Sequence, residues 1–154
     1  MSNIYKDIEK WIKRITTPIN GYQICPYARK AKYKIYTHLD RVALLKYAIY
    51  WKGEYDLMIC ELADSSMTVE EASYIEYECN LFAKDTITLL DHPDKPGYID
   101  GNYTGNGKRI LFLIQSKEDL QKARTHLKTT TYYNLWTNTY YKDILREEKK
   151  NENS

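Results

Sequence analysis

Apolar side chains recur along this chain at the three-to-four-residue spacing of an amphipathic helix. In the clearest stretch, Thr68 and Glu71 match a capping box, and Ala72, Ile75 and Cys79 then share one helix face. Other stretches repeat the pattern, among them one that places Trp11 on an apolar face and one that Asp40 would cap. The spacing predicts helices over residues 3–16, 40–52, 68–82, 117–128 and 138–149.

Short β-prone runs lie between these helices. The run from Asp56 to Leu62 is almost continuously apolar, which is typical of a central strand covered on both faces. Residues 86–90 and 108–115 can pair as a wide antiparallel hairpin across an irregular loop at 91–107. Strands are predicted over residues 33–37, 56–62, 86–90 and 108–115, with an edge strand over 129–134.

Alternating helices and strands of these lengths predict an α/β fold, with α+β as the alternative. We expect a layered sandwich in which helices pack on a mixed sheet of four to five strands. No linker or repeat divides the chain, so residues 1–148 are predicted to form one domain, followed by a polar tail at 149–154.

Charge and cysteine content narrow the classes of function. The formal net charge of the 154 residues is +2, which argues against a dedicated nucleic-acid-binding protein but leaves room for a local basic patch. The three cysteines are widely spaced and form no Cys-x-x-Cys pair, which favours a reducing, cytoplasmic setting. The longest fully apolar run, Ile110–Ile114, is too short to cross a membrane.

Tyrosine replaces phenylalanine almost throughout, with 16 Tyr against 2 Phe. Together with many Lys, Ile and Asn residues, this indicates the codon bias of an AT-rich genome, as is common in viruses and streamlined bacteria. The bias says little about function, because a tyrosine ring packs in half-buried sites much as phenylalanine does.

Residue types that carry chemistry gather in two irregular segments. Cys25 lies in a turn beside Pro26, and His92 follows a predicted strand, where α/β sheets place their ligands. The first hypothesis is therefore an enzyme acting on a small molecule, with Cys25 as nucleophile or redox thiol, His92 as base and Asp91 or Asp94 as its orienter. The alternative is that Cys25 simply packs the turn, since free cysteine is among the most buried residue types.

The second hypothesis is a non-catalytic protein that binds an anionic ligand such as a nucleotide. In either case the glycine-rich loop would bind the anion through its backbone N–H groups and two basic side chains. The predicted ligand-binding residues are Asn102, Tyr103, Thr104, Gly105, Gly107, Lys108 and Arg109. A third hypothesis is host interaction or assembly through the Tyr/Trp-rich segment 131–141. No metal-ligand spacing is present, and neither a cofactor nor an oligomeric state is specified.

The order of the short motifs resembles an uncharacterised bacterial family of unknown function. Members of that family have a Trp-containing helix, a Leu-Cys-Pro-Phe-Ala motif, a His-Pro segment and an Asn-Tyr-Thr segment before a strand. The matching positions are Trp11, 24–28, His92-Pro93 and 102–104. After Asn-Tyr-Thr the family continues with an Asn-Arg-Ser-Pro-like run, where this chain has Gly105-Asn106-Gly107. The resemblance implies the location of a site and no particular reaction.

Overall fold

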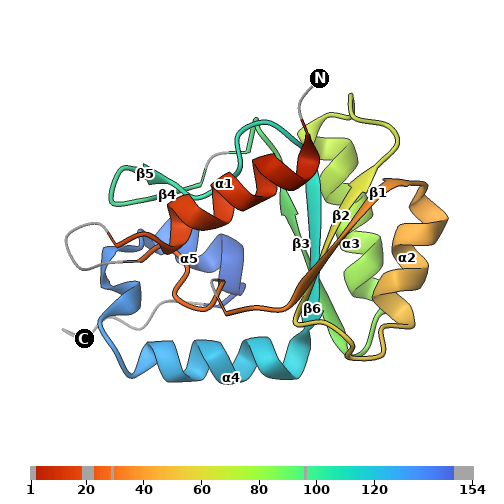
Figure 1. Cartoon of the computed structure of the whole chain (residues 1–154). Helices are drawn as coiled ribbons and strands as arrows, with labels where there is room; N and C mark the ends of the chain where they lie inside the picture. The colour runs from red at the N-terminus through yellow and green to blue at the C-terminus, as the bar shows by residue number, and fades with distance from the viewer. Residues whose placement is uncertain (1–2, 19–22, 29, 96, 148–154) are drawn as a thin grey trace.

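A mixed four-stranded sheet with the strand order β1–β2–β6–β3 is the centre of the structure (Figure 1). The computed structural model describes residues 3–18, 23–28, 30–95 and 97–147. Strand β6 runs antiparallel to both of its neighbours, whereas β1 and β2 are parallel. The carboxyl ends of β1, β2 and β3 therefore meet at one edge of the sheet. The strands are β1 (Tyr33–Leu39), β2 (Leu57–Leu62), β3 (Thr86–Asp91) and β6 (Leu111–Ser116).

Two helices cover one face of this sheet, α2 (Arg41–Ile49) and α3 (Val69–Phe82). The predicted caps form, because the Asp40 side chain accepts from the Ala43 N–H and the Thr68 side chain accepts from the Glu71 N–H. Buried residues of both helices pack on β2 and β6 and build the first core. This core includes Leu44, Ala48, Met58, Cys60, Ala72, Ile75, Cys79, Phe112 and Ile114.

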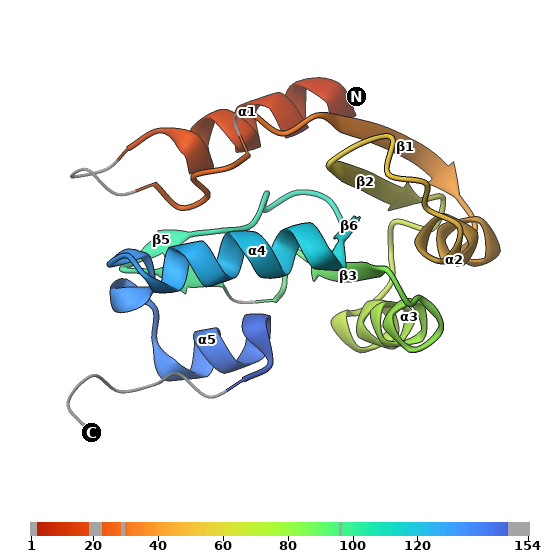
Figure 2. The same cartoon turned by 90° about the horizontal axis from the view of Figure 1, so that it is seen from below.

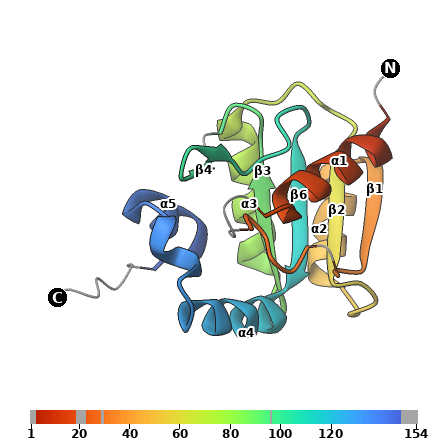
Figure 3. The same ribbon diagram turned by 60° about the vertical axis from the view of Figure 1, so that its left-hand side comes forward.

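The opposite face is covered by α1 (Ile4–Thr16), α4 (Lys117–Lys128), the 3-10 helix η1 (Tyr132–Leu135) and α5 (Asn138–Leu145). Seen from below, α1, α4 and α5 lie to one side of the strands, and α2 and α3 lie to the other (Figure 2). Figure 3 shows α4 leading from the end of β6 towards α5. The second core contains Ile8, Trp11, Ile15, Ile24, Ile35, Ile59, Ile99, Leu111, Tyr133, Trp136 and Tyr141.

The outer edge of strand β3 is covered by side chains of α3. Asn80 donates to the Thr88 carbonyl oxygen at 2.9 Å and accepts from the Thr88 N–H at 2.8 Å. One turn earlier, Glu76 accepts from the Leu90 N–H at 2.5 Å and pairs with Arg146 after α5. These side chains take the place of a fifth strand, so the main chain of β3 is hydrogen-bonded on its outer side.

The α/β class, the mixed sheet and the antiparallel pairing of β3 with β6 are confirmed. The edge strand predicted over 129–134 is wrong, because these residues end α4 and enter η1. The predicted irregular loop 91–107 contains a two-stranded hairpin, β4 (Tyr98–Ile99) and β5 (Asn102–Tyr103).

Several predicted boundaries also shift. Helix α2 ends at Ile49 rather than residue 52, and α5 ends at Leu145 rather than residue 149. Strand β6 begins at Leu111 rather than residue 108. The polar tail predicted at 149–154 lies outside the described residues. Among the described residues, no helix is both long enough and apolar enough to span a membrane.

Candidate functional site

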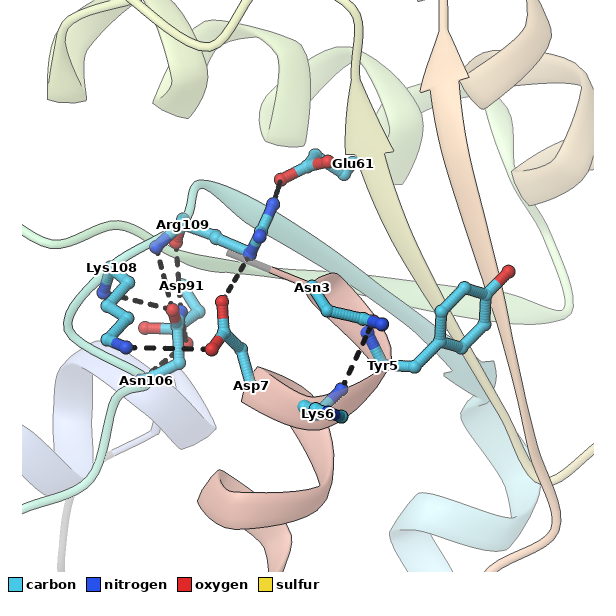
Figure 4. Close-up of polar contacts among 9 residues, drawn as sticks. All are labelled: Asn3, Tyr5, Lys6, Asp7, Glu61, Asp91, Asn106, Lys108 and Arg109. Carbon is cyan, nitrogen blue, oxygen red and sulfur yellow. Dashed lines mark hydrogen bonds and ion pairs between the residues drawn. The ribbon is translucent and has the colours of Figure 1, made fainter. Parts of the chain in front are cut away.

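Asp91 is the last residue of β3, one residue beyond the predicted strand, and lies at the carboxyl edge of the sheet. Its Oδ2 atom accepts from the backbone N–H of Asn106 at 3.0 Å and from the Asn106 side-chain amide at 2.6 Å (Figure 4). Burial raises the pKa of the Asp91 carboxyl, although the Asn106 hydrogen bonds act in the opposite direction. Its other oxygen lies close to Gly105, where an added Cβ would stand 2.6 Å from it.

Arg109 joins helix α1 to the sheet. Its guanidinium lies 3.0 Å from the Asp7 carboxylate on α1 and 2.8 Å from the Glu61 carboxylate on β2 (Figure 4). Lys108 lies 3.5 Å from Asp7 as well. The hydrogen bond from Arg109, followed by the charge of Lys108, lowers the pKa of Asp7. The two cations predicted to bind an anionic ligand are thus already neutralised by carboxylates of this chain.

The glycine-rich loop uses its polar groups internally. The backbone N–H groups of Lys108 and Arg109 both donate to the Asn106 side-chain oxygen, at 3.0 Å and 2.7 Å. Gly107 has a φ of +77°, a left-handed conformation that glycine adopts without strain and that completes this turn. Asn102 donates to the nearby Asp100 carbonyl at 3.3 Å. These contacts do not favour an anion site in the loop, and that role stays a prediction.

Carbonyl groups of the same loop anchor α1. Arg14 donates to the carbonyls of Tyr103 and Gly105, and the Trp11 indole donates to the Thr104 carbonyl at 3.0 Å. The Thr104 hydroxyl donates to the Gly97 carbonyl at 3.1 Å and accepts from the Tyr140 hydroxyl. The Asn-Tyr-Thr segment therefore connects α1, the β4–β5 hairpin and α5.

His92 is 4% exposed and has main-chain partners on both ring nitrogens. Nδ1 accepts from the Asp94 N–H at 3.0 Å, so the proton lies on Nε2, which donates to the Met67 carbonyl at 2.9 Å. The imidazole is thereby held in one neutral tautomer that joins the turn after β3 to the segment before α3. Asp94 orients the ring through its backbone N–H, and its carboxylate is exposed.

Cys25 is half-buried in the turn that follows α1, and its N–H donates to the Ile15 carbonyl at 2.9 Å. Burial raises the pKa of its thiol, although the N–H groups of Ala28 and Tyr27 act to lower it. A raised pKa disfavours the thiolate, the reactive form of the side chain. Among the described residues, the Cys25 thiol has no hydrogen bond with His92. The catalytic pair stays a prediction, and this geometry lends it little support.

The predicted site residues divide between the wall of one large cavity and the loop outside it. The cavity, of about 590 Å³, lies between the sheet and the helices of the second core. Cys25, Asp91, His92, Tyr103, Thr104 and Gly105 line it. Asp94, Asn102, Gly107, Lys108 and Arg109 are not among its lining residues.

Apolar and aromatic side chains from every element of this face form the cavity wall. Helix α4 contributes Leu120, Ala123 and Leu127, which share one face of the helix. No α4 residue is fully buried, because this face borders the cavity. The aromatic cluster predicted near the C-terminus closes the far side, where Tyr133 and Trp136 meet edge to face at 4.9 Å.

Arg124 is a cation on this apolar wall that sequence reasoning did not single out. Within the described residues, its guanidinium makes one hydrogen bond, at 3.5 Å, to the Ile144 carbonyl. No carboxylate of the described residues lies within ion-pair distance of it. Burial lowers the pKa of Arg124, although the charges of Tyr133 and Glu147 act to raise it. The sequence feature that points to Arg124 is its position next to Ala123, at the border of the apolar face of α4.

In the described part of the chain, no group of three or more His, Cys, Asp or Glu side chains could hold a metal ion.

Comparisons with family models, with curated proteins and with solved structures give no match to this chain. The resemblance of the short motifs to a bacterial family stays a prediction.

Proposed function

We propose that this protein binds a small, mainly apolar molecule carrying one anionic group, in the cavity between the sheet and α4. The observation that carries the proposal is the guanidinium of Arg124, set in an apolar wall without a carboxylate partner among the described residues. The cavity volume of about 590 Å³ falls in the range of small-molecule sites, roughly 300–1,000 Å³.

The chemistry of arginine indicates the kind of ligand. A guanidinium presents a planar fork of N–H donors that matches a carboxylate in two parallel hydrogen bonds. A half-buried guanidinium with one long hydrogen bond retains most of these donors. A bound anion would supply the missing partner in a region of low dielectric constant, and the apolar body of the ligand would contact Leu120, Ala123 and Leu127.

This proposal keeps the anionic ligand of the second hypothesis from the sequence. The cation that binds it is Arg124 instead of Lys108 and Arg109. Lys108 and Arg109 are paired with Asp7 and Glu61, so a ligand anion would have to compete with two carboxylates. Arg124 has no carboxylate within ion-pair distance among the described residues, although the charge of Glu147 acts on it from farther away. Binding also has better support than catalysis by Cys25 and His92, because the imidazole already has two main-chain partners.

The test uses 1-anilinonaphthalene-8-sulfonate, an apolar anion whose fluorescence rises in apolar surroundings. We expect saturable binding to the folded protein and displacement by octanoate or decanoate. Arg124→Met should weaken binding by about 10- to 100-fold, the equivalent of a charged hydrogen-bonded pair. The affinity of Arg124→Lys should lie between those of the wild type and Arg124→Met. Arg41→Met, on the opposite face of the sheet, should bind like the wild type.

A second variant distinguishes binding inside the cavity from attraction to a basic surface. Ala123→Phe fills the space beside Arg124 and leaves its charge in place, whereas Ala123→Ser is the size-matched control. Loss of binding in Ala123→Phe alone supports the cavity. Equal binding by the wild type and Arg124→Met, with near-ultraviolet circular dichroism unchanged, would refute the proposal.

A further inference from the structure

A second cavity, of about 430 Å³, lies on the other face of the sheet, beside the edge strand β1. We call it the β1–α2 groove. It is bounded by β1, the C-terminal part of α2 and the segment that leads into β2. Five aromatic side chains and two lysines line it. These residues are Tyr36, Tyr47, Tyr50, Trp51, Tyr55, Lys46 and Lys52.

Two tyrosine rings of the groove lie close together. Tyr36 and Tyr47 lie with their ring centres 4.5 Å apart and their planes inclined by 31°. Gly53, at a φ of +77°, turns the chain beneath the indole of Trp51, where an added Cβ would lie 3.6 Å from the ring. Rings held in this way provide faces on which a planar heteroaromatic group can stack.

One buried polar atom of the groove has no hydrogen-bond partner among the described residues. The indole Nε1 of Trp51 is buried and makes no hydrogen bond within the described residues. An unpaired buried donor costs the free protein about 1–3 kcal/mol. A ligand acceptor that reached this N–H through a small movement of the ring would remove that cost.

The charge around the groove is positive. Lys46 and Lys52 line it, and Lys32 lies 5.9 Å from the ring centre of Tyr55. Lys34 is two residues before Tyr36 on β1, so both side chains leave the same face of the strand. In the described part of the chain none of these four lysines has an ion-pair partner. Glu54 is the carboxylate that lines the groove.

We propose that the β1–α2 groove binds a nucleoside phosphate, with the base stacked on the tyrosine and tryptophan rings and the phosphate paired with Lys46 and Lys52. Aromatic faces beside unpaired lysines are the combination that binds nucleotides without sequence preference. The small net charge of the whole chain does not oppose this proposal, because the lysines gather locally. A free nucleotide and a single strand both present this chemistry, and their relative affinities distinguish the two sources.

The experiment measures binding of two probes to the full-length protein: N-methylanthraniloyl-ATP by fluorescence, and fluorescein-labelled (dT)10 by anisotropy. We expect at least one Kd below 1 mM, weakened at least tenfold in Lys46→Gln/Lys52→Gln. The matched control is Lys10→Gln/Lys13→Gln, which removes the same charge from the exposed face of α1. Trp51→Phe keeps a ring but removes the N–H, and should weaken binding by a smaller factor.

The relative affinities identify the source of the ligand. Similar affinity for both probes indicates a free nucleotide, and at least tenfold tighter binding of (dT)10 indicates a single strand. Binding of neither probe would overturn the proposal. So would equal loss of binding in the two double-lysine variants, because it would show attraction to overall charge rather than to the groove.

Discussion

Asn80→Ala tests how the free edge of the sheet is closed. Asn80 exchanges two hydrogen bonds with the main chain of Thr88, as a neighbouring strand would. Thr88 is 0% exposed, so water cannot replace the lost partner without local opening. The substitution therefore leaves one buried N–H and one buried carbonyl without a partner.

The expected loss follows from these two bonds. Leaving buried polar groups unpaired costs about 1–3 kcal/mol each, and the half-buried position of Asn80 favours the lower part of that range. The higher helix propensity of alanine offsets about 0.5 kcal/mol of this loss in the free energy of unfolding. We expect the free energy of unfolding to fall by about 2–3 kcal/mol, with a melting temperature lower by about 4–12 °C for a chain of this size.

Urea denaturation at 25 °C measures this difference. The control is Leu81→Ala, in the same turn of α3, where the side chain is 59% exposed and the expected loss is small. The stability of Asn80→Asp should depend on pH, because only the protonated acid can donate to the Thr88 carbonyl. Its stability relative to the wild type should improve as the pH falls towards about 4. A loss below about 0.5 kcal/mol for Asn80→Ala, or no pH effect in Asn80→Asp, would refute the reasoning.

Three further predictions concern the cavity wall. Gly105→Ala should lower the free energy of unfolding by about 1–3 kcal/mol, because its Cβ would meet the Asp91 carboxylate and the Tyr103 ring; an unchanged urea midpoint would contradict this contact. Cys25 should react with iodoacetamide at pH 7 more slowly than glutathione does, because burial raises its pKa; faster reaction would restore the catalytic hypothesis. Burial also raises the pKa of Asp91, so its contribution to stability is present below the ordinary value of 3.8 and is lost as the pH rises through the raised pKa. Asp91→Asn should therefore gain stability relative to the wild type across that pH rise, and parallel pH profiles would count against the raised pKa.

Local signals account for the parts of the fold that could be predicted from the sequence. The predicted capping residues Asp40 and Thr68 both accept from backbone N–H groups at helix starts, as their positions indicate. The pairing of residues 86–90 with the strand after the long loop follows from two apolar runs of similar length. Cys60 and Cys79 are core residues, as their positions in apolar patterns predict.

The segment after α4 shows where local propensity fails. Its threonines and tyrosines favour a strand, but Tyr133 and Trp136 stand three residues apart and pack against Tyr141. A spacing of three matches a 3-10 helix, and the aromatic contacts outweigh the β-propensity. That outcome depends on the packing of Tyr133 and Trp136 against Tyr141 of α5, which the β-propensity of single residues does not describe.

The candidate site could be predicted only in part for the same reason. The sequence places Asp91, Tyr103 and Cys25 near one site, and all three line the large cavity. It cannot show that Asp7 and Glu61, 54 residues apart, neutralise Arg109. Nor can it distinguish Arg124 from a solvent-exposed arginine, because the cavity beside it results from how α4 and α5 stand against the sheet.

The most direct test of the proposed function is a thermodynamic cycle between ligand charge and Arg124. Isothermal titration calorimetry would compare octanoate with 1-octanol, which has the same chain length without the negative charge, in the wild type and in Arg124→Met. We predict that the wild type binds octanoate at least tenfold more tightly than 1-octanol and that Arg124→Met removes this preference. An equal preference in both proteins, or no binding of octanoate to the wild type, would contradict the account.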